Sequence, residues 1–312
     1  MEKRILVTGG TGMVGRYLQE ILPNATYVGS KQCDLTNYNQ VEQFWNHIEP
    51  TNVIHLGAKV GGIVENLNYP ADFYDINTIM NSNVLKASKH HNVKRLTGIL
   101  STCMYPDVVE TYPMTEDNIH DGPPSFANFS YGFTKRSLSV GIDAYNKQYE
   151  TNWNYLIPCN LYGEYDHFED PEKCHFITAL IRKIIDSENN GESNITLFGT
   201  GKPLRQFMHA SDLARVIKIV IENDITESFN VATPEENSIK DMATITLEAL
   251  DKNMGVVFDS DKPDGQYRKT VSCDKMMSLI DDFEFTKLKD GVIKVYEEVI
   301  KKIWKIKFYH GR

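Results

Sequence analysis

The sequence has few cysteines and no closely spaced pair of them. The five are Cys33, Cys103, Cys159, Cys174 and Cys273. Their odd number and wide spacing exclude a disulfide framework and a cysteine zinc site. No run approaches the roughly 20 apolar residues that a membrane helix needs, and the apolar run Ile5–Val7 is too short for the core of a signal peptide. We therefore expect a cytoplasmic protein without a membrane segment.

Excess positive charge is also missing. The chain has 33 Lys and Arg against 42 Asp and Glu, a formal net charge of −9, which argues against partners such as nucleic acids or anionic membranes. Any anionic ligand must then be held by a local group of donors. With 312 residues, 41% hydrophobic and 24% charged, the chain has an ordinary globular composition and room for one large domain or two.

Short β-rich runs alternate with helix-length patterns through the first two thirds of the chain. The predicted strands are Ile5–Thr8, Thr26–Val28, Val53–Leu56, Leu96–Ser101 and Tyr155–Pro158. The predicted helices are Val14–Leu22, Tyr38–His47, Ala71–His91 and Tyr131–Tyr149. This alternation is typical of βαβ units and predicts an α/β fold with a doubly wound parallel sheet.

The pattern loosens after Asn160 into a charged loop, Glu164–Lys173, and a helix from Phe176 to Ser187. A strand Arg205–His209, a helix Ser211–Glu222 and a strand Phe229–Ala232 are expected to return to the sheet, before a helix capped by Ser238-x-x-Asp241, a strand Val256–Phe258 and a C-terminal helix. We expect residues 1–163 and 204–233 to form a dinucleotide-binding domain, and residues 164–203 and 234–312 a smaller α/β substrate-binding domain.

A glycine-rich loop follows the first strand and begins the first helix. It contains Gly9, Thr11, Gly12, Met13, Val14 and Gly15. Glycines at these spacings let backbone N–H groups approach a pyrophosphate at the positive end of a helix. A bare glycine motif is often an ordinary turn, but its place in a βαβ pattern favours a Rossmann dinucleotide site.

The end of the second predicted strand indicates which dinucleotide is bound. NAD enzymes usually place a carboxylate there for the ribose 2′-OH, whereas this chain has Ser30 and Lys31. A hydroxyl and an ammonium suit a 2′-phosphate, so we expect NADP(H). The alternative is that Lys31 is a solvated loop lysine. Asp34 and Leu35 are expected near the adenine.

Tyr131 and Lys135 lie four residues apart and so share one face of a predicted helix. The lysine charge should lower the pKa of the phenol, which could then exchange a proton with a carbonyl oxygen. Such a pair is usually only a helix-surface pair. Here Ser101 ends the fourth predicted strand at the ligand-binding edge of the sheet, where it could hydrogen-bond the same oxygen.

Cys103 and His175 are candidates for a base and an acid. If the chain stays extended after Ser101, residues two apart point the same way, so Cys103 faces what Ser101 faces. A thiolate beside a ketone can remove the acidic proton α to the carbonyl, and His175 could supply a proton from the opposite face. The alternatives are a small buried cysteine and a histidine that caps a helix.

No metal site is expected. His90 and His91 are adjacent on a predicted helix, so their side chains should diverge and form no metal pair. No other group of His, Asp or Glu has zinc or magnesium spacing.

With these residues the chain resembles the extended short-chain dehydrogenase/reductases and, among them, the GDP-L-fucose synthase family over nearly its whole length. The more specific matching segments are 59–63, 66–73, 101–106, 158–163, 199–207 and 262–265. In that family GDP-4-keto-6-deoxy-D-mannose is epimerised at C3 and C5 and then reduced at C4 with NADPH. The resemblance implies that Cys103 is the base, His175 the acid and Tyr131 the proton donor at the C4 oxygen. Lys135 would then tune the phenol, and Ser101 would bind the oxygen.

The resemblance also assigns binding residues and an assembly. The cofactor residues that it adds are Leu56, Ala58, Lys135, Pro158, Asn160 and Leu161. The residues expected around the GDP are Lys183, Phe198, Arg205 and Lys269. It further implies a homodimer in which the helices Ala71–His91 and Tyr131–Tyr149 of each subunit form a four-helix bundle.

Departures from the family leave alternatives open. The family usually has Pro at Glu164, Asn at His167, Pro at Thr178 and Trp at Phe198. Residues 164–178 should border the sugar, so these departures affect the expected substrate. The alternative function is that of an enzyme that only reduces or only epimerises a related GDP-4-keto sugar of the colitose or 6-deoxyheptose pathways. A nucleotide-sensing protein that merely binds a dinucleotide is a third hypothesis, but it has no need of Cys103 or of the Tyr131/Lys135 pair.

Overall fold

The computed structural model describes residues 3–169, 174–262 and 264–310 of the chain, with side chains described as far as residue 304. Residues 170–173, at the end of the expected charged loop, and Pro263, in the segment 262–265, lie outside the described residues. Within the described ranges, no helix is both long enough and apolar enough to span a membrane.

Six parallel strands form the central sheet, in the order β10-β5-β4-β3-β1-β2. Their bounds are β1 Ile5–Thr8, β2 Thr26–Val28, β3 Asn52–His55, β4 Arg95–Ile99, β5 Asn154–Pro158 and β10 Phe229–Val231. Apolar residues such as Leu6, Val7 and Ile54 are fully buried, as expected for strands covered on both faces. The strand order reverses between β1 and β3, and ligands bind at such a reversal.

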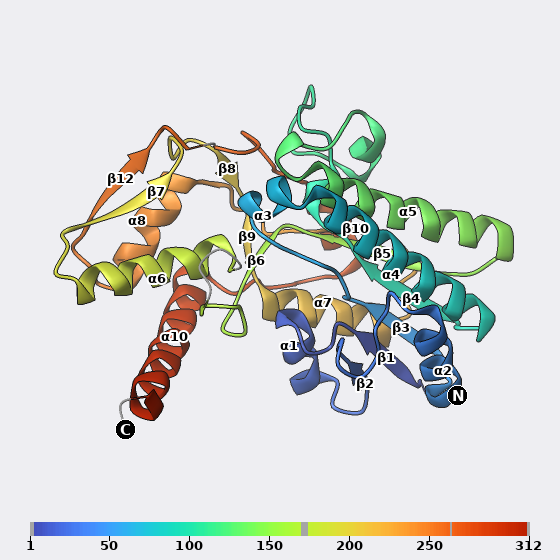
Figure 1. Cartoon of the computed structure of the whole chain (residues 1–312). Helices are drawn as coiled ribbons and strands as arrows, with labels where there is room; N and C mark the ends of the chain where they lie inside the picture. The colour runs from blue at the N-terminus through green and yellow to red at the C-terminus, as the bar shows by residue number, and fades with distance from the viewer. Residues whose placement is uncertain (1–2, 170–173, 263, 311–312) are drawn as a thin grey trace.

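Helices cover both faces of the sheet, which confirms the doubly wound architecture (Figure 1). In one layer, α4 (Pro70–His90) packs between α2 (Tyr38–Ile48) and α5 (Phe129–Tyr149). In the other, α1 (Met13–Ile21) packs against α7 (Ala210–Glu222).

A second group of elements lies beside the sheet (Figure 1). It contains β6 Asn160–Tyr162, α6 Phe176–Asn189, β7 Asn194–Phe198, β8 Leu204–Arg205, β9 Phe207–His209, β11 Asn237–Ser238, α8 Ile239–Ala249, β12 Gly255–Asp259 and α10 Leu288–His310. These strands form three two-stranded sheets, β12-β7, β6-β9 and β11-β8. Buried side chains such as Ile181, Leu197 and Val295 form separate apolar clusters around α6, α8 and α10.

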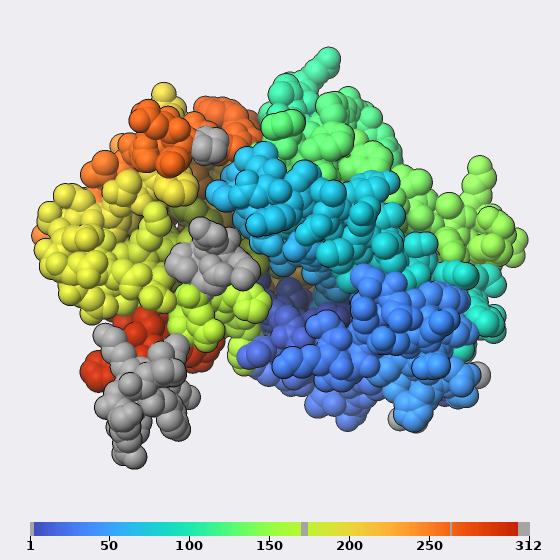
Figure 2. All heavy atoms as spheres, viewed as in Figure 1, coloured from blue at the N-terminus to red at the C-terminus, as the bar shows by residue number. Residues whose placement is uncertain are grey.

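The remaining elements are short. They are α3 Ile63–Asn68, α9 Asp274–Leu279 and the 3-10 helices η1 Thr102–Met104, η2 Glu116–His120 and η3 Phe126–Asn128. In the space-filling view the surface is indented where the blue and cyan first third of the chain meets the green and yellow segments (Figure 2).

The predicted elements lie within two residues of the observed ones, but the fourth strand ends at Ile99 and leaves Ser101 outside it, and the segment Arg205–His209 does not join the central sheet as expected. The capping box of Ser238 and Asp241 is present at the start of α8. The single strand predicted over Arg205–His209 is wrong, because the chain breaks at Gln206 into β8 and β9. The two pieces pair with different strands, β8 with β11 and β9 with β6, and the buried side-chain amide of Gln206 between them donates to the carbonyls of Thr233 at 2.7 Å and Val271 at 3.0 Å.

Candidate active site

The glycine loop between β1 and α1 forms a cradle for a phosphate. Gly9 has φ +68°, and a Cβ there would lie 2.8 Å from the backbone nitrogen of Gly57, so no larger residue fits. A Cβ on Gly15 would collide with the backbone of Gly10. Gly12 differs, because its nearest neighbour would be a carbonyl oxygen at 3.3 Å, and it begins α1 without a side-chain cap. The positive helix end is therefore open to a pyrophosphate, which fits a dinucleotide.

The turn after β2 lies against this loop. A Cβ on Gly29 would lie 2.6 Å from the hydroxyl of Thr11, and Ser30 and Lys31 follow as exposed residues. Hydrogen bonds from Thr36 lower the pKa of Asp34 and keep it charged. A hydroxyl and an ammonium thus stand at the end of β2, where a 2′-phosphate requires them.

The other predicted cofactor residues lie along the same edge of the sheet. Met13 and Val14 begin α1, and Leu56 and Ala58 follow β3. Pro158 ends β5, and Asn160 and Leu161 belong to β6. The Asn160 amide donates to the backbone carbonyl of Gln206 at 2.9 Å, so its orientation is fixed. The buried Leu35 packs against Gly57, because a Cβ on that glycine would lie 2.7 Å from the Leu35 side chain.

Ser101 and Cys103 are not on an extended chain, so that prediction is wrong. Ser101 is the N-cap of η1, and its Oγ accepts a hydrogen bond from the backbone N–H of Cys103 at 3.2 Å. A serine that caps a helix turns the chain immediately after it. The turn nevertheless keeps both side chains near Tyr131, whose phenol interacts with the hydroxyl of Ser101 and with the charge of Cys103.

Cys103 lies beside a buried cation. The Nζ of Lys269 is 3.3 Å from its Sγ, although 166 residues separate them in the sequence. Burial raises the pKa of the thiol, but the charge of Lys269, hydrogen bonds from Ser101 and Lys269, and the charge of Arg205 outweigh it. The net effect lowers the pKa, so the thiolate is favoured, as a cysteine base requires.

Tyr131 and Lys135 share the first turns of α5, as predicted, but the predicted pKa effect is wrong. Burial raises the pKa of Tyr131 well above its ordinary value, and the charge of Cys103 adds to this. Lys135 donates from Nζ to the carbonyl of Ile99 at 2.8 Å, and burial lowers its own pKa to about 8. The raised pKa favours the protonated phenol, the form that can donate a proton.

His175 precedes α6 and is oriented by a carboxylate that sequence reasoning missed. Asp166 accepts from its Nδ1 at 2.9 Å and from its backbone N–H at 2.8 Å. The side chain of Asp166 is 2% exposed and that of His175 is 42% exposed, so the imidazole remains accessible. Burial lowers the pKa of His175, but Asp166 outweighs this and the charge of Cys103 adds to it, so the pKa lies above its ordinary value. The protonated form is favoured, as an acid requires.

The predicted nucleotide residues fall into two groups. Arg205 and Lys269 lie beside Cys103, and Arg205 Nη1 donates to the carbonyl of Leu204 at 2.8 Å. Lys183 lies apart from them on α6, where its Nζ donates to the carbonyl of Thr196 at 2.7 Å and sits 4.9 Å from the ring centroid of Phe198. Phe198 is 56% exposed, so its face is open to a ligand.

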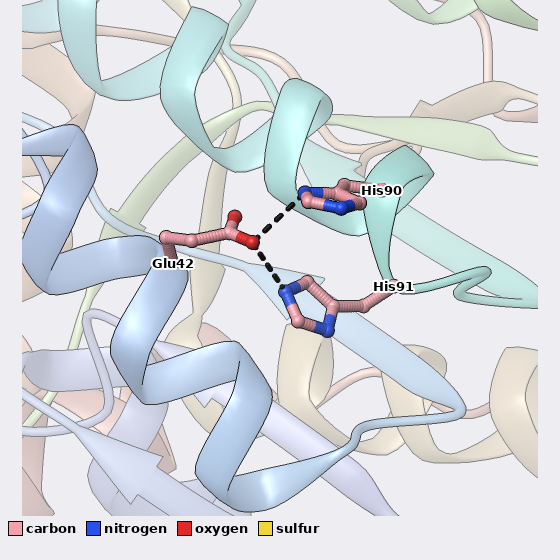
Figure 3. A group of neighbouring side chains, drawn as sticks. All are labelled: Glu42, His90 and His91. Atoms are coloured by element: carbon pink, nitrogen blue, oxygen red, sulfur yellow. Dashed lines mark hydrogen bonds and ion pairs between the residues drawn. The ribbon is translucent and has the colours of Figure 1, made fainter.

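The prediction that His90 and His91 diverge is wrong. His90 is the last residue of α4, and His91 is its C-cap, with φ −90° and ψ 15°. Because His91 is no longer helical, the rotation between successive helical residues does not separate the two rings. Both point to Glu42 on α2 (Figure 3). The expectation of no metal-type grouping fails here, because the ligand atoms of these three residues lie within 4.8 Å of one another.

Known proteins share this arrangement over most of the chain. Residues 5–232 match the model of the NAD dependent epimerase/dehydratase family. A GDP-L-fucose synthase of Dictyostelium discoideum is 36% identical, with 93% of each chain covered. A GDP-L-colitose synthase of Yersinia pseudotuberculosis is 32% identical, with 93% of this chain and 96% of that protein covered.

A solved structure agrees with these sequence matches. The crystal structure of a GDP-L-fucose synthetase from Naegleria fowleri bound to NADP has a TM-score of 0.87 and 33% identity, and covers 97% of this chain and 94% of that one. Taken with the glycine cradle and the cluster around Cys103, these similarities lead to one conclusion. The chain belongs to the NAD dependent epimerase/dehydratase family and, within it, to the GDP-L-fucose synthases.

Proposed function

We propose that this protein is an NADPH-dependent epimerase/reductase that converts GDP-4-keto-6-deoxy-D-mannose into GDP-L-fucose. The observation that carries the proposal is the opposite tuning of two groups in one site. The pKa of Cys103 is lowered and that of His175 is raised, so a thiolate base and an imidazolium acid coexist. Groups whose pKa values are pushed apart in this way are typical of acid/base catalysis. The similarity to GDP-L-fucose synthases supports the same assignment.

The epimerisation uses Cys103 and His175. The Cys103 thiolate removes the proton on C3 or C5, next to the C4 ketone, and the electron pair moves onto the C4 oxygen. The protonated His175 then returns a proton to the same carbon from the opposite face, which inverts it. Asp166 keeps the imidazole in the orientation and charge state for this transfer.

The reduction uses Tyr131. The glycine cradle would hold NADPH, with Ser30 and Lys31 toward the 2′-phosphate, and the bound cofactor would supply the hydride for C4. The neutral phenol of Tyr131 gives its proton to the C4 oxygen, and Ser101 hydrogen-bonds the same oxygen. Lys135, fixed by the carbonyl of Ile99, supplies positive charge beneath the phenol as its proton leaves.

The sugar nucleotide lies between the two groups of cations. Lys183 and the exposed ring of Phe198 are positioned for the GDP, and Arg205 is positioned for the diphosphate. Lys269 is assigned a role beyond the expected contact with the GDP, because its contact with Sγ favours the ionised form of Cys103. On this assignment, residues 164–203 and 234–312 form the substrate domain and residues 1–163 and 204–233 the cofactor domain.

A homodimer of this enzyme, located in the cytoplasm, would use α4 and α5. These helices pack together and leave apolar side chains exposed, among them Tyr74 and Ile79 on α4 and Phe133 and Val140 on α5. Covering these side chains with the same helices of a second copy removes them from water. Light scattering of the purified protein should give twice the chain mass, and a monomer at micromolar concentration would contradict this assembly.

The test of the function is a reaction in D2O. The purified protein is incubated with GDP-4-keto-6-deoxy-D-mannose and NADPH, and the product is analysed by NMR. We expect GDP-L-fucose with deuterium at C3 and C5, because each inversion exchanges the carbon-bound hydrogen with solvent. An unlabelled product of D configuration would instead make the protein a plain 4-reductase. Turnover of only a colitose- or heptose-type ketone would overturn the substrate assignment.

Removing the cation beside the thiol should move its titration. In Lys269→Met the thiolate loses its nearest positive charge, so the pKa of Cys103 should rise by about 1–2 units. The rate of iodoacetamide alkylation, followed against pH, would then reach its midpoint at a higher pH than in the wild type.

Lys183→Met is the matched control, because it removes a lysine whose Nζ contacts Thr196 and Phe198 and not the thiol. Its alkylation profile should equal that of the wild type. If Lys269→Met alkylates with the wild-type profile while still binding NADPH, Lys269 does not tune the thiol.

A further inference from the structure

Outside the active site, two histidines converge on one carboxylate between α2 and the end of α4 (Figure 3). His90 Nδ1 is 2.8 Å and His91 Nε2 is 3.0 Å from Oε1 of Glu42. The other oxygen, Oε2, accepts a hydrogen bond from the hydroxyl of Tyr38 at 3.0 Å. None of these four residues takes part in the proposed reaction, so the cluster needs a separate explanation.

The cluster has the composition and geometry of a half-open metal site. Two imidazoles and one carboxylate are a ligand set of divalent transition metals, with the fourth position left to water. A tetrahedral site with bonds of about 2.1 Å spaces its ligand atoms about 3.4 Å apart, and here the three atoms lie within 4.8 Å of one another. The side chain of His90 is 67% exposed and that of His91 is 16% exposed. His90 can therefore turn to complete the site while His91 and Glu42 stay in place.

The hydroxyl of Tyr38 supplies the outer contact that such a site needs. It holds Oε2, so Oε1 is directed toward the two ring nitrogens, and outer hydrogen bonds of this kind orient metal ligands. The Tyr38 ring is itself fixed by Lys86, whose Nζ lies 4.2 Å from the ring centroid. Without a metal, both imidazoles approach the same oxygen of Glu42, Oε1, and each can bind it only through an N–H group.

We propose that Glu42, His90 and His91 bind one divalent transition-metal ion of the zinc class, which joins α2 to the C-terminal end of α4. Imidazole nitrogens favour Zn²⁺ or Ni²⁺, whereas Mg²⁺ and Ca²⁺ require oxygen ligands. Because the ligands come from two helices and are assembled only in the folded chain, bound metal stabilises the native state.

Zinc titration of the full chain tests the site. The titration uses a Cys103→Ala background, so that the active-site thiol cannot bind the metal together with His175. Isothermal titration calorimetry at pH 7.5 should show one equivalent of ZnCl2, and excess zinc should raise the melting temperature by about 3 °C. MgCl2 should do neither.

Ligand variants identify the residues involved. His90→Ala, an exposed substitution with little effect on folding, and Glu42→Gln should each abolish the tight equivalent. Tyr38→Phe should weaken it by about 10-fold, the effect of losing an outer contact. The matched control is His47→Ala, which removes an exposed histidine of the same helix α2 and should leave binding unchanged. No zinc equivalent, or one that survives both His90→Ala and Glu42→Gln, would overturn the proposal.

Discussion

Cys103→Ala is expected to abolish epimerisation, with a loss of about 10³-fold or more in the rate of C3 and C5 exchange. The anionic form of the thiol is favoured by two neighbouring cations, because the charges of Lys269 and Arg205 lower its pKa. Positioned general bases contribute about 10²–10⁴-fold, and alanine leaves nothing to accept the proton. Deuterium incorporation from D2O, followed by NMR without NADPH, measures this step alone.

Cys273→Ala is the matched control for this loss. Burial and the charge of Asp274 raise the pKa of Cys273, which is the N-cap of α9, so its removal should leave exchange at the wild-type rate. The Cys103 variant should still bind NADPH and reduce a ketone that has already been epimerised. Wild-type deuterium exchange in Cys103→Ala would refute its assignment as the base.

Tyr131→Phe is expected to have the opposite effect: the reduction should be lost while the epimerisation continues. The variant keeps the ring but loses the proton that the neutral phenol gives to the C4 oxygen, so NADPH oxidation should fall by about 10²–10⁴-fold. Exchange at C3 and C5 should continue, because Cys103 and His175 remain. The substrate ketone labelled at both carbons should therefore accumulate.

The pH dependence gives a second reading of Tyr131. A raised pKa means that the phenol keeps its proton to higher pH, so wild-type reduction should not decline through loss of this proton below pH 10. Tyr149→Phe, at the exposed end of the same helix α5, should behave as the wild type. Full NADPH oxidation by Tyr131→Phe would require another donor.

The fold could be predicted because its signals are local. The buried runs of β1 and β3 and the alternation of strands with helices depend on neighbours a few residues away, and they indicate the sheet type. The break at Gln206 could not be predicted, since β8 and β9 pair with two different strands, β11 and β6, from distant segments. Local periodicity does not report such long-range partners.

The site was predictable in its residues and less so in its electrostatics. Tyr131 and Lys135 were found from helical spacing, and Cys103 from its place after β4. Asp166 was missed because a carboxylate in a charged loop has no distinguishing pattern until His175 is placed against it. The direction of the Tyr131 pKa also depends on burial and on Cys103, which spacing does not reveal.

The last strand of the sheet has a consequence for the order in which the chain is synthesised. β10 (Phe229–Val231) pairs with β5 (Asn154–Pro158), so about seventy residues, which include α6 and α7, emerge between the two. Until then β5 is an edge strand with unpaired N–H and C=O groups, and the side-chain amide of Asn154 has yet to meet the carbonyls of Ile225 and Glu227. An uncovered edge of a parallel sheet is a template for aggregation. A chain that stops before residue 229 therefore keeps β5 as an exposed edge strand, and we expect it to aggregate.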